Sequence, residues 1–254
     1  MTSETPEAFG LIVIGDEILF GKRRDRHFEH FREFLGARGL RLERCWFLPD
    51  DHATLVEHLG FSLKGTLPVF VCGGIGATPD DLTRGCAAEA AGVALLRHAS
   101  AAQLIEQRFG DSAYPTRIRM ADLPEGCQLI PNPHNQIPGF SLGQHYFLPG
   151  FPELAWPMAE WVLQQHYPGA TARLEERCVE VLDTPESRLV LLMERLGDRF
   201  PGLKLYSLPQ LQSGDGARIE LGFRGRGAID EAFEALLREL DKAGIPHRDS
   251  PAKD

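Results

Sequence analysis

The order of apolar and helical segments in the first 91 residues limits the possible folds most strongly. Residues 9–15, "FGLIVIG", form a continuous apolar run ending in glycine, which is typical of a strand buried on both faces. Apolar spacing and stop signals then predict, in turn, a helix, a strand, a helix, a strand and a helix, at residues 25–39, 40–48, 51–63, 67–72 and 80–91. This order indicates βαβ units, and therefore a three-layer α/β fold with a mostly parallel sheet and helices on both faces.

The remaining chain predicts more helix and a second, smaller domain. A helix is expected near residues 100–109, two strands joined by a Pro/Asn/Gly loop before residue 150, and a helix over 153–166. After "HYPGATA", the pattern predicts a compact α+β unit of βαββα order, with its segments at residues 173–182, 185–200, 203–208, 217–223 and 228–243. Residues 245–254 are expected to be a frayed tail. We therefore predict two domains, 1–168 and 169–254.

Composition narrows the functional classes. The chain of 254 residues is 43% hydrophobic and 25% charged, with a net charge of -9, which argues against a general nucleic-acid or anionic-membrane binder. Five scattered cysteines without a C-x-x-C pair indicate reduced thiols in a cytoplasmic protein. No signal peptide or membrane span is visible.

Three acidic loops follow the first three predicted strands. They are "GDEILFGK", "LPDD" and "GGIGATPDDLTR", at residues 15–22, 48–51 and 73–84. Ligands of open parallel sheets bind beyond the carboxyl ends of the strands, so these loops should converge on one site.

The third loop combines two opposite features. Backbone N–H groups in a glycine-rich loop can bind an anion, whereas aspartate carboxylates repel one. Gly73, Gly74 and Gly76 would let the backbone approach a ligand closely, and successive N–H groups would form an anion nest at the start of the next helix. Thr78 and Thr83 could add hydroxyl donors. A divalent cation held by the carboxylates would bridge to phosphate oxygens and could activate a water molecule. The loop matches neither the P-loop nor the dinucleotide-binding pattern.

Each acidic loop also has a plainer interpretation. Asp80 stands at a predicted helix start, where aspartate is a common cap. One of Asp50 and Asp51 should cap the following helix, and Asp16 with Glu17 can form a solvated turn. Three acidic loops at three strand ends together favour a site over three unrelated turns.

These motifs in this order, followed by "PGF" and "LPGFPEL", resemble the molybdopterin-binding (MoaB/Mog-like) domain. The most similar version is the N-terminal domain of the competence/damage-inducible protein A (CinA) family, and the resemblance covers about residues 9–166. The trailing unit is similar to the small KH-like domain that follows in that family. The C-terminal amidase domain of full-length CinA proteins has no room in this chain and is expected to be absent.

The resemblance implies a site for a nucleotide diphosphate or a pterin phosphate. It implies metal-dependent hydrolysis of a nucleoside diphosphate such as ADP-ribose, with Mg²⁺, Mn²⁺ or Co²⁺ as cofactor. Asp50, Asp51 and Asp81 are the expected catalytic residues, and Asp16, Asp50 and Asp81 the expected metal ligands. The expected ligand contacts are Gly15, Asp16, Glu17, Gly73, Gly74, Gly76, Thr78 and Thr83. The alternatives are molybdopterin binding or adenylylation in molybdenum-cofactor biosynthesis, and a non-catalytic ligand-binding relative. A homo-oligomer is expected, a dimer before other states.

Two departures from the family pattern stand near the expected site. The family usually has asparagine where this chain has His27, which we interpret as a helix-surface residue, with a phosphate ligand or proton donor as the alternative. Residues 132–137, "NPHNQI", are bulkier than the small residues usual there. The KH-like part has no GXXG loop between two helices, which favours a packing or dimerisation module over nucleic-acid binding.

Overall fold

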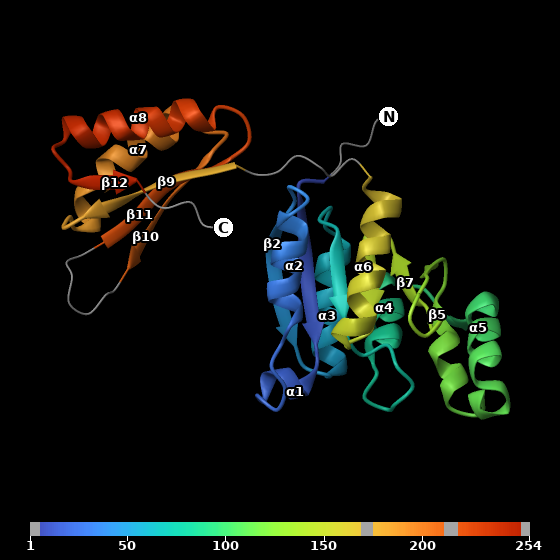
Figure 1. Cartoon of the computed structure of the whole chain (residues 1–254). Helices are drawn as coiled ribbons and strands as arrows, with labels where there is room; N and C mark the ends of the chain where they lie inside the picture. Colours follow the sequence, from blue (N-terminus) through green and yellow to red (C-terminus); the bar gives the residue numbers. More distant parts are fainter. Residues whose placement is uncertain (1–5, 169–174, 211–217, 250–254) are drawn as a thin grey trace. The chain divides into compact units, whose positions relative to one another are not determined.

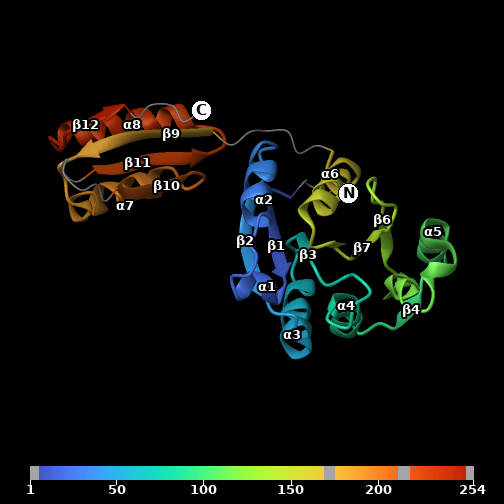
Figure 2. The ribbon, with the colours of Figure 1, turned by 60° about the horizontal axis from the view of Figure 1, so that its bottom comes forward.

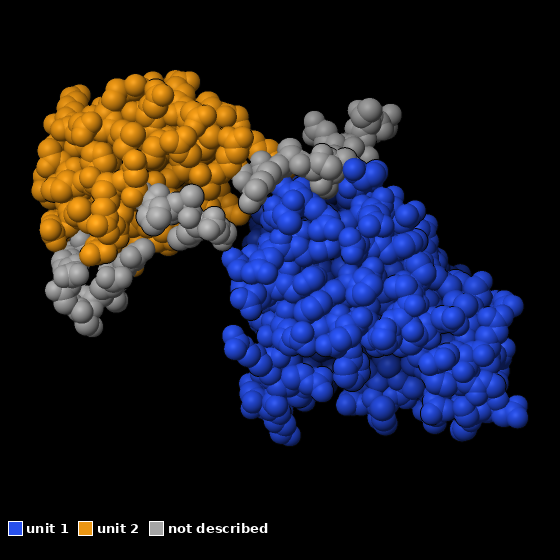
Figure 3. All heavy atoms as spheres, viewed as in Figure 1, with its two compact units in different colours: residues 1–172 blue, residues 173–254 orange. Residues whose placement is uncertain are grey.

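The computed structural model describes residues 6–168, 175–210 and 218–249. The chain divides into two compact units, residues 1–172 and 173–254, coloured blue and orange in Figure 3. Each unit is described by itself. Among the described residues, no helix combines the length and the apolar character needed to cross a bilayer.

A six-stranded sheet of order β2-β1-β3-β8-β7-β6 forms the centre of the first unit (Figure 1). Its strands are β1 (Ala8–Ile14), β2 (Arg41–Leu48), β3 (Val69–Cys72), β6 (Gln128–Ile130), β7 (Gly139–Leu142) and β8 (His145–Leu148). The pairs β1–β2, β1–β3 and β3–β8 are parallel, whereas β7 pairs antiparallel with both β8 and β6. The mostly parallel sheet predicted from the sequence is confirmed.

Helices cover both faces of this sheet, as Figure 2 shows. On one face lie α2 (His27–Gly36) and α6 (Pro152–His166), and on the other lie α3 (His52–Leu63), α4 (Thr83–Ala91) and α5 (Ala99–Phe109). The side chains of β1 alternate between the two cores: Phe9 packs toward α2 and α6, and Ile12 packs toward α3. The three-layer prediction is therefore confirmed.

Several short elements differ from the prediction. A four-residue helix, α1 (Asp16–Leu19), stands in the first loop, and two short strands, β4 (Leu95–Arg97) and β5 (Asp122–Pro124), form a separate sheet. Two 3₁₀ turns, η1 (Gly110–Ala113) and η2 (Arg117–Ala121), lie between α5 and β5. These elements are too short for periodicity to reveal them.

The second unit is an antiparallel sheet of order β10-β11-β9-β12 that carries two helices. Its elements are β9 (Glu175–Leu182), η3 (Glu186–Arg188), α7 (Val190–Arg199), β10 (Lys204–Gln210), β11 (Arg218–Gly225), α8 (Ile229–Lys242) and β12 (His247–Asp249). The α+β prediction is confirmed. The predicted tail is wrong for residues 247–249, because β12 pairs with β9 and Arg248 forms an ion pair with Glu180. The end of the predicted tail, 250–254, lies outside the described residues.

Candidate functional site at the carboxyl ends of the strands

The fold brings the three acidic loops to the same edge of the sheet, beside the segment that follows β8. The backbone N–H of Gly15 donates to the carbonyl of Leu48 (3.1 Å), which joins the ends of β1 and β2. The N–H of Gly73 donates to the carbonyl of Leu148 (3.0 Å), which joins the ends of β3 and β8. The predicted convergence of the loops therefore occurs.

Asp16 and Asp50 form the direct link between the first two loops. The N–H of Asp16 donates to Asp50 Oδ2 (3.0 Å), and the N–H of Asp50 donates to Asp16 Oδ1 (3.4 Å). Within the described residues, the second oxygen of each carboxylate accepts no hydrogen bond. Partial burial raises the pKa of Asp50, and the negative charges of Asp16, Glu17 and Asp80 raise it further. Negative charge is thus concentrated around Asp50.

The other acids of these two loops have local partners. Asp51 is the N-cap of α3 and accepts from the N–H (2.9 Å) and the hydroxyl (2.7 Å) of Thr54, which lowers the pKa of Asp51. Asp51 is therefore the helix cap expected of one of the two aspartates, and Asp50 faces the first loop. Glu17 lies within 3.6 Å of Arg23, and its carboxylate folds back over Gly15, where a Cβ would stand 2.8 Å from Glu17 Oε2.

Contacts within the chain explain the glycines at the start of the third loop. Gly73 has a φ of +118°, and a Cβ there would lie 2.2 Å from the carbonyl oxygen of Ile14. Gly74 has a φ of +65°, and its Cβ would lie 2.2 Å from Oγ1 of Thr83. Only glycine fits where the loop passes this close to β1 and to the start of α4.

Asp81 organises the same loop from inside. Its Oδ1 accepts from the N–H of Gly76 (2.9 Å), and its Oδ2 accepts from the N–H (2.8 Å) and the hydroxyl (2.5 Å) of Thr78. A Cβ at Gly76 would lie 2.5 Å from Asp81 Oδ2, so this glycine makes room for the carboxylate. Asp81 therefore shapes the loop that was expected to bind the ligand.

The interpretation of Asp80 as a helix cap is wrong. The helix α4 begins at Thr83, its N-cap is Leu82, and no side chain caps it. Asp80 is exposed, and its carboxylate caps no helix. The helix begins late because Asp81 bonds back into the loop instead of continuing the helix.

The two threonines predicted as ligand donors have partners inside the protein. Thr83 is fully buried, and its hydroxyl donates to the carbonyl of Gly73 (2.9 Å). The Thr78 hydroxyl donates to Oδ2 of Asp81. Backbone donors remain available in their place.

Three N–H groups of the glycine loop stay open. In the described part of the chain, the amides of Gly74, Ile75 and Ala77 have no hydrogen-bond acceptor. The Gly74 carbonyl accepts from the N–H of Thr83 (3.0 Å), so this part of the loop lies beside the start of α4, whose N-terminus adds a partial positive charge. This part of the loop can therefore receive an anion.

Arg84 is a residue of the site that the sequence analysis missed. It is 8% exposed, and its guanidinium donates to the carbonyls of Gly76 (2.6 Å), Arg119 (2.5 Å) and Asp122 (3.1 Å). Burial lowers the pKa of Arg84, while the nearby charges of Asp81 and Asp122 oppose this shift. The signal in the sequence was an arginine followed by the small residues "GCAA" at the start of a helix, a position that packing would bury.

His27 is buried, so its interpretation as a helix-surface residue is wrong. It is 4% exposed, and its Nε2 lies 3.1 Å from the carbonyl oxygen of Gly150, to which it donates. Burial lowers the pKa of His27, which keeps the ring neutral at pH 7. A Cβ at Gly150 would lie 3.4 Å from the Cα of Gly73. His27 thus holds the segment after β8 against the glycine loop.

The bulky segment at residues 132–137 lies at the same end of the sheet. It connects β6 to β7, and β7 is antiparallel to β8, so its entry stands beside the carboxyl end of β8. Asn132 is buried, and its Oδ1 accepts from the N–H groups of His134 (3.0 Å) and Asn135 (3.4 Å). The segment is an ordered turn at the edge of the candidate site.

The cysteines beside the glycine loop are unreactive in character. Cys72 and Cys86 are both buried, and burial raises the pKa of Cys86 to about 11 and that of Cys72 well above its ordinary value. They pack as small apolar side chains.

The expected three-carboxylate metal centre does not assemble. Across residues 6–168, 175–210 and 218–249, no three His, Cys, Asp or Glu side chains come together as a metal-binding group. Asp16 and Asp50 are adjacent, but Asp81 is turned into its own loop. Any cation here would have two protein carboxylates at most, with its other ligands from water or from the bound molecule.

The family described as "Probable molybdopterin binding domain" matches residues 10–168. A CinA-like protein of Citrifermentans bemidjiense is 38% identical over 173 residues, covering 65% of this chain and 41% of that protein. A CinA-like protein of Myxococcus xanthus is 32% identical over 270 residues, covering 92% of this chain and 64% of that protein. The chain thus spans between 41% and 64% of the length of these two relatives.

The fold also resembles that of solved structures. The crystal structure of the protein CinA with unknown function from Thermoplasma acidophilum superposes with a TM-score of 0.58 at 26% identity, covering 64% of this chain and 99% of that chain. The matches cover the segment in which the motif resemblance was found. The expected absence of an amidase domain stays a prediction.

Proposed function

Because the chain belongs to the family described as "Probable molybdopterin binding domain", we propose that the loops at the carboxyl ends of its strands bind a pterin phosphate of the molybdopterin type. The observation that supports this is the set of open backbone N–H groups at Gly74, Ile75 and Ala77, in a loop whose Gly74 carbonyl accepts from the N–H of Thr83 (3.0 Å), the first residue of α4. Backbone amides at a helix N-terminus are a favourable site for a phosphate group.

The Asp16–Asp50 pair suits a divalent cation in this proposal. Each carboxylate keeps one oxygen without a hydrogen bond from the described residues, and partial burial, together with the neighbouring negative charges, raises the pKa of Asp50. Mg²⁺ usually binds one or two carboxylates and completes its shell with water and substrate phosphates. Such a cation would let an anion approach the acidic loops.

Asp81 and Arg84 act as positioning residues. Asp81 holds the N–H groups of Gly76 and Thr78, while Arg84 holds the carbonyl of Gly76. The peptide units on either side of Gly76 are thereby fixed before a ligand arrives. A fixed loop loses less conformational entropy on binding than a flexible one.

The test compares two neighbouring isosteric substitutions. Purified protein is titrated with molybdopterin by calorimetry, with Mg²⁺ and with EDTA. Asp50→Asn should weaken binding in Mg²⁺ about tenfold, or ~1.4 kcal/mol, because it removes a charged ligand of the cation. Asp51→Asn is the matched control and should bind like the wild type, because asparagine also caps helices. Absence of molybdopterin binding by the wild type, with or without metal, would refute the proposal.

Hydrolysis of ADP-ribose stays a separate prediction that the comparisons do not support. It is tested by AMP release from ADP-ribose with Mg²⁺, Mn²⁺ or Co²⁺. Turnover that Asp50→Asn abolishes and Asp51→Asn retains would add a hydrolase activity to the binding site. Without turnover, hydrolysis is excluded, and the binding proposal depends on the titration alone. Self-association, with a dimer expected first, likewise stays a prediction.

A further inference from the structure

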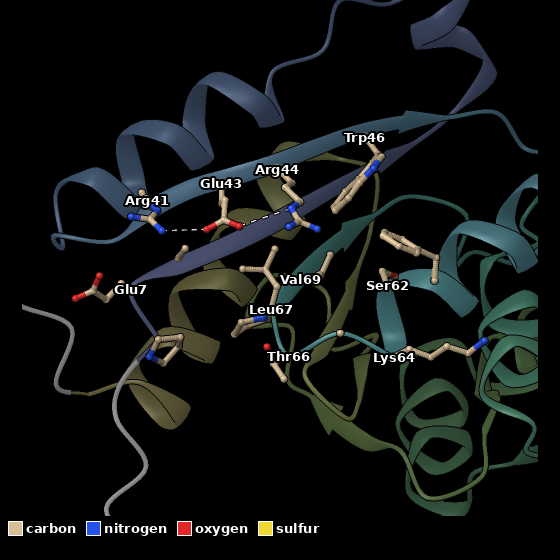
Figure 4. Close-up of a pocket in the computed structure, with 15 residues that line it drawn as sticks. Glu7, Arg41, Glu43, Arg44, Trp46, Ser62, Lys64, Thr66, Leu67 and Val69 are labelled. Carbon is tan, nitrogen blue, oxygen red and sulfur yellow. Dashed lines mark hydrogen bonds and ion pairs between the residues drawn. The ribbon is translucent and has the colours of Figure 1, made fainter. Parts of the chain in front are cut away.

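A cavity of about 600 Å³ lies at the opposite end of the sheet from the acidic loops. It is bounded by the start of β1, by β2, by the end of α3 and by residues 64–68, which lead into β3 (Figure 4). Its volume lies within the range of small-molecule sites. Since β1, β2 and β3 are parallel, their amino ends and the candidate pterin site are separated by the length of the strands.

The floor of this cavity depends on Gly10. A Cβ at Gly10 would lie 3.1 Å from Val69 Cγ2 and 3.2 Å from Trp46 Cζ3. The same atom would lie 3.3 Å from Leu67 Cδ2. Trp46 and its apolar neighbours therefore pack directly over the β1 backbone, and the floor is apolar.

A β-bulge in β2 determines which of its side chains line the cavity. The register between β1 and β2 passes from Phe9–Leu42 to Gly10–Arg44, which leaves Glu43 as the extra residue. After the bulge, Arg44 lies two residues before Trp46, so both side chains project from the same face of β2. Figure 4 shows Arg44 and Trp46 side by side on β2, with Lys64 across the cavity.

The lining carries more positive than negative charge. Its three cations are Arg41, Arg44 and Lys64, and its two acids are Glu7 and Glu43. Glu43 lies 3.1 Å from Arg41 and 3.6 Å from Arg44, so one carboxylate is shared by two guanidinium groups. Lys64 forms no ion pair or hydrogen bond through its side chain in the part of the chain that the structure describes. One full positive charge is therefore available to an anionic ligand.

Aromatic rings line the same space. Trp46 is half-buried, and Phe61 on α3 is 62% exposed, which is unusual for a phenylalanine. The Ser62 hydroxyl, which also lines the cavity, already has hydrogen-bond partners within the protein: it donates to the carbonyl of Leu59 (3.2 Å) and accepts from His145 (2.9 Å). The cavity thus offers ring faces and cations, and Thr66 adds an exposed hydroxyl.

We propose that this cavity is a second ligand site, for a small molecule that has a flat ring and one anionic group, of the nucleoside monophosphate class. The ring would stack against Trp46 and Phe61, and the anionic group would bind Arg44 and Lys64. Stacking on aromatic side chains tolerates any flat base, and a guanidinium–ammonium pair favours phosphate. The role of the site would be binding.

The test uses AMP as the probe, with the full chain in EDTA so that cation-dependent binding at the acidic loops is suppressed. The three tryptophan indole N–H signals are followed by NMR, and Trp46→Phe assigns one of them. AMP should shift the Trp46 signal and leave those of Trp156 and Trp161 in place. Adenosine and ribose 5-phosphate, each lacking half of the ligand, should bind at least about tenfold more weakly than AMP.

Matched lysine substitutions complete the test. Lys64→Ala should weaken AMP binding about tenfold, whereas Lys242→Ala, on the second unit, should leave it unchanged. The proposal is overturned if about 1 mM AMP leaves the Trp46 signal in place, or if Lys64→Ala binds AMP as tightly as Lys242→Ala does. Asp81→Asn, which should disturb the glycine loop with or without a cation, should retain AMP binding, and its loss there would assign the probe to the acidic loops instead.

Discussion

The N–H of Asp16 donates to Oδ2 of Asp50 across 3.0 Å, although the two residues are 34 positions apart in the chain. This bond joins the first two loops and leaves two carboxylates side by side. Their mutual repulsion raises the pKa of Asp50, in addition to the larger effect of burial. A bound cation would relieve that repulsion, which makes the pair a test of the proposed metal requirement.

The effect of Mg²⁺ on molybdopterin affinity should distinguish the role of Asp50 from that of Asp81. We expect Asp50→Asn to reduce molybdopterin affinity about tenfold in Mg²⁺ and to have little effect in EDTA. Asp81→Asn should reduce affinity by a similar factor in both buffers, because asparagine has one acceptor oxygen where Asp81 uses two to shape the loop. Calorimetric titrations in the two buffers measure both effects. An Asp81→Asn defect confined to Mg²⁺ would identify Asp81 as a metal ligand.

Replacing Arg84 should destabilise the first unit. Arg84→Met leaves the carbonyls of Gly76, Arg119 and Asp122 without their donor, so we expect a loss of about 3 kcal/mol in the free energy of unfolding. Arg84→Lys should retain part of the stability, since one ammonium group cannot reach all three carbonyls.

Tryptophan fluorescence during urea unfolding gives the measurement for Arg84, because all three tryptophans of the chain, Trp46, Trp156 and Trp161, belong to the first unit. A loss below about 1 kcal/mol in Arg84→Met would show that water replaces the guanidinium without cost.

Two glycines with positive φ should respond differently to alanine. Gly92, at the end of α4, has a φ of +69° and nothing within 4 Å of its potential Cβ, so Gly92→Ala should cost only the backbone strain, about 1 kcal/mol. Gly73→Ala adds a Cβ at 2.2 Å from the Ile14 carbonyl oxygen and should cost at least about 2 kcal/mol more. The same urea assay compares them. Equal costs would mean that the glycine loop shifts away from β1 easily.

The stability of the first unit should fall in mild acid because of His145. Burial lowers the pKa of His145 to about 4, from 6.5 in the unfolded chain, so the unfolded state binds more protons between these values. Stability is therefore complete above pH 6.5 and decreases as the pH falls toward 4, by roughly 3 kcal/mol. His27 acts in the same direction.

The control for His145 is His145→Gln, which has no proton to gain in this range and should show a flatter pH dependence in urea titrations from pH 7 to 4.5. Equal slopes for the wild type and this variant would mean that His145 is protonated as readily in the folded protein as in the unfolded chain.

The sequence predicted the central strand β1 well because this strand is apolar and buried along its whole length. In β1, Phe9 and Ile12 face different cores, so neither face can be polar and the apolar run is continuous. The edge strand β12 carries the polar residues His247, Arg248 and Asp249, and its assignment depends on pairing with β9. That pairing cannot be read from local pattern.

The sequence predicted where the candidate site lies, but not the directions of its side chains. The spacing of acids and glycines located the three loops, because it reflects strand ends. The direction of each side chain depends on contacts between distant segments: His27 turns inward to meet Gly150, and Arg84 reaches Arg119 and Asp122. A local sequence pattern contains no information on such partners.

The contact of Gly150 with Gly73 also concerns the order in which the protein is made. During synthesis β1, β2 and β3 are made first, and β8 can pair with β3 only after residue 148 has been added. The hydrogen bond from His27 to the Gly150 carbonyl forms later still, and so does the contact of Gly150 with Gly73. Contacts this far apart in sequence form slowly. During synthesis, the residues of the glycine loop are therefore present before β8 and Gly150, which pack against the loop, have been made.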